Sequence, residues 1–260
     1  WGFVKRSLAI HDLKSGSGLI DRRKATEALW FDGVLPNRTE KYGEALRDQV
    51  LFRSKPGWRQ REVVLILDDM AGEAISDPKM VTNENFPHFA SLADVIYIVP
   101  AEDMSASIME EFVSRLEQAN AEGVPIDLSR TNLIFVISKI DQLEHGGPAE
   151  KDLFARILPH PDRYRLPQHG DRAELKAYIE EMEEVHHGIE DWLRTHKPGF
   201  FQFFNLFGSL RCCGISALGI QPTKEPQGND YEFTLAFRPE PVRVVDPIFW
   251  LLKENGLIHF

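Results

Sequence analysis

The sequence has few cysteines and no long apolar run, and each shortage excludes a class of protein. The only two cysteines among the 260 residues, Cys212 and Cys213, are adjacent. Adjacent cysteines provide neither a disulfide framework nor the spacing of a metal site, so we expect a reducing environment. No apolar run approaches the roughly 18 residues that a membrane-spanning helix needs. The pattern predicts a cytoplasmic protein with no membrane span.

Basic residues are also in short supply. The chain carries 30 Lys and Arg against 40 Asp and Glu, a formal net charge of -10. Surfaces that bind nucleic acid usually carry basic stripes, so a nucleic-acid partner is not indicated. With 43% hydrophobic residues the chain can bury the core of one large domain with insertions.

Apolar runs bounded by polar residues predict the fold. We expect strands near residues 49–53, 62–67, 94–100, 132–137 and 211–215, and helices near 105–121, 172–194 and 247–254. The first two strands flank Pro56-Gly57, which is typical of a hairpin. Strands that alternate with helices predict an α/β fold with a mostly parallel sheet and helices on both faces. Residues 1–260 are interpreted as one domain with a helical insertion at approximately 142–200.

Three short motifs follow three of these strands, in a fixed order. They are Asp69-Met70-Ala71-Gly72-Glu73, Ser138-Lys139-Ile140-Asp141 and Ser216-Ala217-Leu218. Ligands of doubly wound folds bind beyond the carboxyl ends of the strands, where all three motifs are expected. One such tripeptide is weak evidence, but the order, strand context and even spacing together predict a nucleotide site.

The first motif has the residue types of a phosphate and metal site. Asp69 can hold Mg²⁺ directly or through water, because hard cations prefer oxygen ligands, and Asp68 is a second candidate. Gly72 lets its backbone N–H approach a γ-phosphate. Glu73 stands where a residue that orients the attacking water is expected. The alternative is a strand followed by an ordinary polar turn.

An upstream loop supplies two further candidates. Thr39 is placed to offer its hydroxyl to Mg²⁺ and its backbone N–H to a γ-phosphate. Arg38, in the same loop, is placed to neutralise charge in a transition state. An ordinary surface loop is the alternative interpretation.

The second and third motifs fit recognition of a base. The Asp141 carboxylate can accept both N1–H and N2–H of guanine, a pair that adenine does not offer. The stem of Lys139 can lie over the base and ribose. Ser216, Ala217 and Leu218 can place a backbone N–H near the guanine O6. The alternatives are a helix N-cap at Ser138 or Asp141, and a strand-to-helix turn capped by Ser216.

Two other clusters have open interpretations. His186 and His187 can bind a metal with carboxylates at helical spacing, or can lie on a solvated helix face. The aromatic segment of Phe200–Phe204 with Leu206 and Phe207 fits either a core or a partner-facing surface. Cys212 and Cys213 are expected to be buried packing residues.

A phosphate-binding loop is missing from this set. The dipeptide Gly-Lys does not occur in the chain, so the pattern G-x-x-x-x-G-K-[ST] is absent. The glycine-rich stretch Ser15-Gly16-Ser17-Gly18 lacks the lysine that contacts the β- and γ-phosphates. Because such a loop precedes the other motifs, we expect it upstream of Trp1.

These motifs carry a resemblance to a known family. The chain resembles a translation-factor-type (TRAFAC) P-loop GTPase. More narrowly, the segments 33–39, 69–73 and 245–252 are similar to bacterial double-GTPase proteins associated with multi-component conflict or defence operons. The resemblance implies a P-loop NTPase-like three-layer sandwich that binds GTP or GDP with Mg²⁺ and hydrolyses GTP. It also implies protein partners in a multi-subunit complex and a role in antiviral defence.

Three functions remain open at this stage. The first is a GTPase switch completed by an upstream phosphate loop. The second is a nucleotide-free scaffold with the same fold, which the missing lysine and the phenylalanine cluster favour. The third is an ATP-using relative, since GTPases usually carry Asn or Thr at the position of Ser138.

Overall fold

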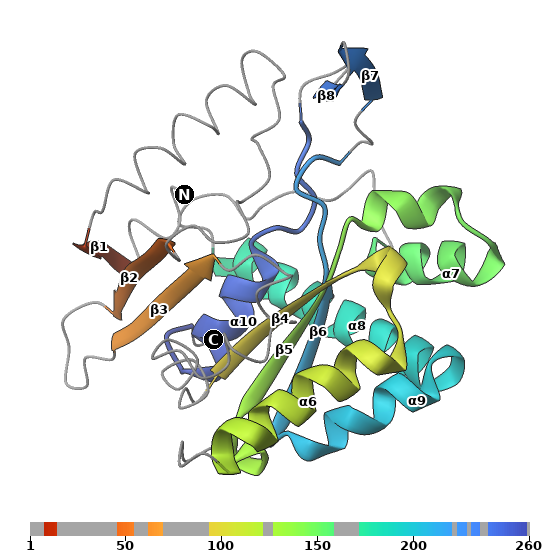
Figure 1. Ribbon diagram of the computed structural model, residues 1–260. Coiled ribbons are helices and arrows are strands. Elements are labelled where there is room, and N and C mark those ends of the chain that lie inside the picture. The colour runs from red at the N-terminus through yellow and green to blue at the C-terminus, as the bar shows by residue number, and fades with distance from the viewer. Residues whose placement is uncertain are drawn as a thin grey trace.

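The computed structural model describes residues 94–121, 127–158, 172–219 and 239–258, together with the backbone of five further strands. Those strands are β1 (Leu8–Lys14), β2 (Leu46–Ser54), β3 (Glu62–Asp69), β7 (Thr223–Gln227) and β8 (Asp230–Thr234). Together the described elements form an α/β fold with a three-stranded parallel sheet (Figure 1).

The parallel sheet is built from β4 (Asp94–Pro100), β5 (Asn132–Ser138) and β6 (Ser209–Gly214), in that order. All three expected strands are therefore confirmed. The five apolar residues 133–137 of the middle strand are fully buried. A continuous apolar run is what a parallel strand covered on both faces requires. Because the strands are parallel, their carboxyl ends meet at one edge.

Each face of this sheet has its own apolar cluster. Phe135 and its neighbours two residues away pack with α6 (Ala106–Ala121) and α9 (Pro198–Phe201). Ile134 and Val136 point to the opposite face and pack with α10 (Asp246–Glu254). This alternation follows from the two-residue period of a strand. Helices therefore cover both faces of the parallel sheet.

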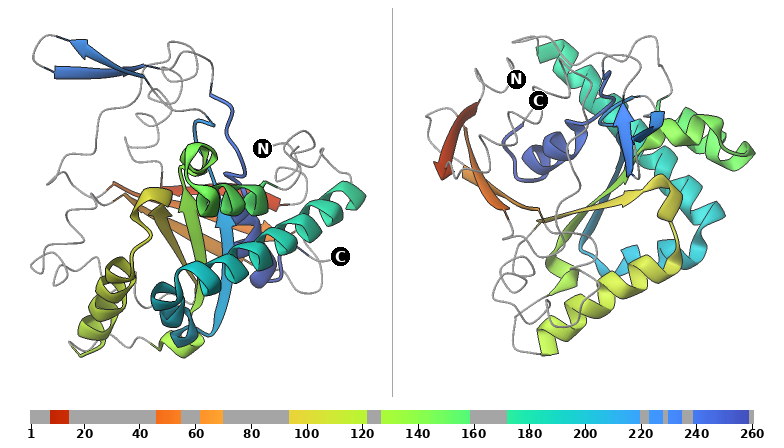
Figure 2. Two further views of the ribbon diagram at one scale, coloured as in Figure 1. Left: turned by 90° about the vertical axis from the view of Figure 1, so that its right-hand side faces the viewer. Right: turned by 45° about the horizontal axis from the view of Figure 1, so that its top comes forward.

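Helix α8 (Arg172–His196) contributes to both clusters. Its first half supplies Tyr178 and Met182 to the cluster of α10. Its second half supplies Ile189 and Trp192 to the cluster of α6. The helix thus passes from one face to the other beside β6, the edge strand, as the two views of Figure 2 show. Its buried residues recur at three- and four-residue intervals, which confirms the helix predicted from that period.

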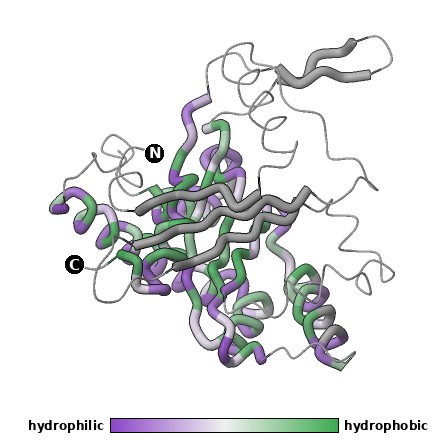
Figure 3. Tube along the Cα trace, turned by 90° about the vertical axis from the view of Figure 1, so that its left-hand side faces the viewer, coloured by the Kyte–Doolittle hydropathy of each residue, from purple (hydrophilic) through white to green (hydrophobic). Residues whose placement is uncertain are grey.

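The helices alternate between hydrophilic and hydrophobic stretches along the tube in Figure 3, as amphipathic helices do. Helix α7 (Pro148–Ile157) lies within the segment interpreted as a helical insertion, and Leu153 and Ile157 bury completely in the core. Pro148 starts this helix, where the missing N–H of proline has no intrahelical partner to lose.

The remaining strands form antiparallel pairs. β2 and β3 pair in the predicted hairpin, and β1 adds to the free side of β2. β7 and β8 form a separate two-stranded ribbon. The sequence pattern did not predict β1, β7 or β8. Among the described helices, none is long and apolar enough to cross a membrane.

Candidate functional site

Two loops leave the carboxyl edge of the parallel sheet side by side. β5 ends at Ser138 and β6 at Gly214, and the two strands are neighbours (Figure 1). The backbone N–H of Ile215 donates to the carbonyl of Ile137 at 2.7 Å, and that of Ile140 donates to the carbonyl of Ile215 at 3.2 Å. These bonds extend the sheet by one step and fix the two loops against each other.

The second and third motifs meet through their side chains. The Ser216 hydroxyl donates to Oδ1 of Asp141 at 2.5 Å, although the residues are 75 positions apart. The same hydroxyl accepts the backbone N–H of Gly219 at 2.8 Å. Ser216 is only 2% exposed, whereas Asp141 is half-buried. The Ser216 hydroxyl therefore orients the Asp141 carboxylate at the edge of the sheet, and both carboxylate oxygens keep lone pairs that can accept further hydrogen bonds.

No protein-family model, curated protein or solved structure matches the chain. The resemblance to GTPases stays a prediction. The site is therefore interpreted from its own geometry and chemistry.

Lys139 occupies a strained position at the end of β5. Its φ angle is 57°, in the left-handed region, which costs a non-glycine residue roughly 1–2 kcal/mol. Its exposed ammonium forms an ion pair of 2.6 Å with Glu102, in the 3₁₀ turn Ala101–Asp103 that follows β4. This hydrogen bond is the largest cause that lowers the pKa of Glu102. Backbone strain of this kind clusters at functional sites.

The other base-recognition candidates lie on the same edge. Ser138 is half-buried and stands opposite Pro100 in the register of the sheet. Ala217 is exposed, and Leu218 is half-buried with its carbonyl accepting the backbone N–H of Glu240 at 2.9 Å. The structure therefore brings together all six residues predicted to recognise a base, which are Ser138, Lys139, Asp141, Ser216, Ala217 and Leu218.

The phosphate and metal candidates lie almost wholly outside the described residues. Asp69 is the last residue of β3, as expected for a motif that begins at a strand end. Its backbone stands opposite Leu46 in the antiparallel ladder. Arg38, Thr39, Gly72 and Glu73 lie outside the residues that the structure describes.

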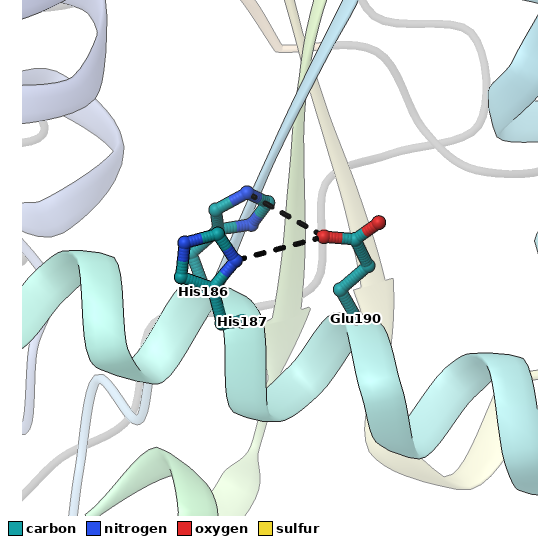
Figure 4. A group of neighbouring side chains, drawn as sticks. All are labelled: His186, His187 and Glu190. Atoms are coloured by element: carbon teal, nitrogen blue, oxygen red, sulfur yellow. Dashed lines mark ion pairs between the residues drawn. The ribbon is translucent and has the colours of Figure 1, made fainter.

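The histidine pair on α8 has the composition of a metal site. His186, His187 and Glu190 place their ligand atoms within 4.8 Å of one another. Figure 4 shows both rings facing the Glu190 carboxylate, with Nε2 of His186 at 3.8 Å and Nδ1 of His187 at 3.9 Å from its Oε2. The expectation of a solvated helix face holds for His187 but is wrong for His186, which is 4% exposed.

The hydrogen bonding of His186 does not suit a metal ligand. Its Nδ1 accepts the backbone N–H of Cys212, in the edge strand β6, at 3.1 Å. A neutral imidazole carries one N–H, so its Nε2, the atom that faces Glu190, holds the hydrogen and has no lone pair for a metal. Burial is the main cause that lowers the pKa of His186 to about 4, and Arg211 adds to it. His186 is therefore a neutral side chain that accepts a backbone N–H of the edge strand β6.

The phenylalanine segment belongs mainly to the core. Phe200, Phe204 and Phe207 are buried in the cluster that covers one face of the parallel sheet. Phe135 packs edge-on against Phe200, with ring centroids 5.3 Å apart. Leu206, by contrast, is 42% exposed to solvent. The core interpretation is therefore confirmed for most of the segment.

One residue of the site region was missed by the sequence interpretation. Arg243 is fully buried and forms ion pairs with Asp246 and Glu181. A sequence signal exists only for the nearer partner, because Asp246-Pro247 marks the start of a helix three residues after the arginine. Glu181 lies 62 positions away on another helix, and no local pattern predicts that pairing.

Proposed function

We propose that the chain is the base-recognition part of a guanine-nucleotide switch that binds GTP with Mg²⁺ and hydrolyses it. The observation that carries this proposal is the hydrogen bond between Ser216 and Asp141. It joins two motifs, each beyond the carboxyl end of a buried parallel strand, where α/β sheets bind ligands.

The chemistry of the edge favours guanine as the base. A carboxylate accepts two hydrogen bonds side by side, and guanine offers N1–H and N2–H in that arrangement. Ser216 orients Asp141 for this contact. Lys139 stands two residues before Asp141, directly after the end of β5, where its stem can cover the base. The backbone of Ala217 and Leu218 lies on the same edge and is available to the guanine O6.

The open side of β4 supports a missing phosphate-binding strand. Among the described strands, β4 is hydrogen-bonded to β5 alone. Ile98, near its carboxyl end, is 54% exposed, whereas the apolar core of β5 is completely buried. A phosphate loop consists of a strand, a glycine-rich turn and a helix. A strand of this kind would add to the side of β4 that faces away from β5, and its helix would cover Ile98.

The remaining roles follow from the resemblance and rest on the proposal. Asp69 and Thr39 would hold Mg²⁺, and Gly72 would approach the γ-phosphate. Glu73 and Arg38 would act on the water and on the charge that develops in the transition state. A defence role within a multi-protein assembly belongs to the same proposal.

The direct test is binding of fluorescent N-methylanthraniloyl-GDP to the protein expressed from its complete reading frame. We expect saturable binding that Asp141→Ala abolishes. The matched control is Asp152→Ala, because Asp152 is an exposed carboxylate on α7 that pairs with Arg156. Absence of binding, or equal binding by the Asp141→Ala variant, would overturn the proposal.

A nucleotide-free scaffold is the second candidate, and the absence of the Gly-Lys dipeptide favours it. The phenylalanine cluster was the other feature that favoured the scaffold, and it no longer does so because most of it is buried in the core. A complete reading frame without a phosphate loop, and no binding of GDP or ADP, would favour the scaffold. Displacement by ADP as effective as by GDP would instead indicate the ATP-using relative.

A further inference from the structure

The turn that carries Ser216 is held by a segment far along the chain. The backbone N–H of Ser216 donates to the carbonyl of Val242 at 3.0 Å, and the N–H of Val242 donates back to Ser216 at 2.8 Å. The N–H of Glu240 donates to the carbonyl of Leu218 at 2.9 Å. Residues 240–243, here called the strap, thus form a short antiparallel bridge with the third motif.

The strap approaches the turn so closely that only glycine fits there. Gly219 has a φ of +71°, and a Cβ at this position would lie 2.1 Å from the carbonyl oxygen of Glu240. Both the left-handed backbone and the missing space exclude a side chain. The close contact between the turn and the strap therefore depends on glycine at position 219.

The chain makes a long excursion between these two segments. The turn ends at Gly219, and β7 and β8 follow before the chain returns to the strap. In Figures 1 and 2 the β7–β8 ribbon lies well away from the parallel sheet. The helix that closes the fold, α10, begins only at Asp246. The conformation of Ser216 is thus set by a returning segment and not by a helix that starts directly after it.

Arg243 anchors the strap to two helices. Its Nε donates to Asp246 on α10 at 2.7 Å, and its Nη1 donates to Glu181 on α8 at 2.5 Å. The Tyr178 hydroxyl donates to the other oxygen of Asp246 at 2.5 Å. Arg243 is completely buried, as is Asp246. Its φ of 53° adds a backbone cost that these charged hydrogen bonds offset.

We propose that Arg243 is a positioning residue for the base site, an inference that rests on the proposed function. Its ion pairs fix Val242, the backbone of Val242 fixes Ser216, and the Ser216 hydroxyl fixes Asp141. Its described partners are Asp246, Glu181 and the ring of Tyr178, and none of these is a base-site residue. Its planar guanidinium bonds two carboxylates in fixed directions, which a lysine ammonium cannot reproduce.

The test compares Arg243→Lys with Arg211→Lys by amide hydrogen exchange and by nucleotide dissociation. Arg211 is the matched control, because it forms a half-buried ion pair of 2.7 Å with Glu254 on α10 and its cation–π partner is Trp250, also on α10. In Arg243→Lys we expect the amides of Ser216, Gly219 and Val242 to exchange about tenfold faster, the effect of weakening one charged hydrogen bond. The amide of Ile215, bonded within the sheet, should keep its protection.

The same variant should release fluorescent GDP about tenfold faster, since tenfold corresponds to one such bond. Arg211→Lys should change neither the exchange of the strap and turn amides nor the dissociation rate. Unchanged exchange in Arg243→Lys, or equal changes in both variants, overturns the inference. If these amides exchange faster in Arg243→Lys but the parent protein binds no nucleotide, the positioning of Ser216 is supported and the proposed function is rejected.

A milder variant covers the case in which Arg243→Lys does not fold. Glu181→Gln keeps a hydrogen-bond acceptor for Arg243 and removes one charge at a half-buried position. It should accelerate exchange of the same three amides in the same direction by a smaller factor. Protection equal to that of the parent protein at all three would contradict the anchoring role.

Discussion

Ser216 and Asp141, 75 positions apart in the chain, share a hydrogen bond of 2.5 Å at the carboxyl edge of the parallel sheet. Ser216 is the hub of this edge, because it also binds Gly219 through its hydroxyl and Val242 through its backbone. The position of the Asp141 carboxylate therefore depends on one buried hydroxyl.

Removing that hydroxyl should cost both stability and base recognition. Ser216→Ala leaves the Asp141 carboxylate and the Gly219 amide without this partner, and we expect a loss of about 2 kcal/mol in the free energy of unfolding. GDP affinity should also fall, by about tenfold. Urea denaturation and fluorescence titration measure the two effects.

The control for this variant is Ser209→Ala. Ser209 donates to Asn132 at 2.7 Å in the first residue pair of the same two strands, at the opposite edge of the sheet. Its removal should lower stability and leave GDP affinity unchanged. A loss of affinity equal to that of Ser216→Ala would show that the effect reflects general loosening of the sheet.

Lys139 is expected to separate stability from function. Lys139→Gly relieves the left-handed backbone strain, so this variant should be at least as stable as Lys139→Ala, which retains the strain. Both variants lose the ion pair with Glu102, whose contribution is small because both side chains are about half exposed. Both should bind GDP more weakly than the parent protein. A glycine variant less stable than the alanine variant in urea would contradict the strain argument.

His186 should make the fold sensitive to mild acid. Its pKa is about 4 in the folded chain, against about 6.5 for an unperturbed histidine, so the unfolded chain binds more protons between these limits. Stability is then fully present above pH 6.5 and declines by about 1.4 kcal/mol per pH unit as the pH falls towards 4. The decline should total about 3 kcal/mol.

Urea midpoints at pH 7.5, 6.5, 5.5 and 5.0 measure this dependence. His186→Gln, whose amide oxygen can still accept the Cys212 N–H, should flatten the profile between pH 6.5 and 5. His187→Gln should flatten the profile much less, because His187 is 68% exposed and is only a minor cause of the low pKa of His186. A profile equally steep in all three proteins would assign the acid sensitivity to other groups.

The two cysteines should be inert in the folded chain. Both are buried, and burial is the main cause that raises the pKa of each thiol well above its usual value. Because the thiolate is the reactive form, Ellman's reagent should label neither cysteine in the native protein and both in guanidinium. Rapid labelling of the native protein would show that the sheet opens beside β6.

Much of the fold was predictable because its central strands have a strong pattern. The continuous apolar run 133–137 predicts a strand covered on both faces, and the three- and four-residue spacing from Leu175 to Leu193 predicts α8. The ribbon strand β7 was missed because Lys224, Glu225 and Pro226 give it no alternation of apolar and polar residues. Local pattern is a poor guide to a short strand stabilised by pairing with its neighbour.

The site was predictable where sequence position alone decides it. Asp141 and Ser216 follow neighbouring parallel strands, so the carboxyl-edge rule brings them together. The burial of His186 and the pairing of Arg243 with Glu181 were not predictable, because each depends on how α8 crosses the edge of the sheet. Histidine and glutamate on a charged helix have the same local pattern whether or not a neighbouring element covers them.

The central claim, that Asp141 reads a guanine base, is tested most directly by exchanging its hydrogen-bonding character. Asp141→Asn replaces a carboxylate that accepts two N–H groups with an amide that donates to one side, which suits the second carbonyl of xanthine. In the complete protein, GDP but not ADP should displace the fluorescent nucleotide, and Asp141→Asn should prefer XDP over GDP. Equal displacement by GDP and ADP, or a preference unchanged in Asp141→Asn, would contradict the account.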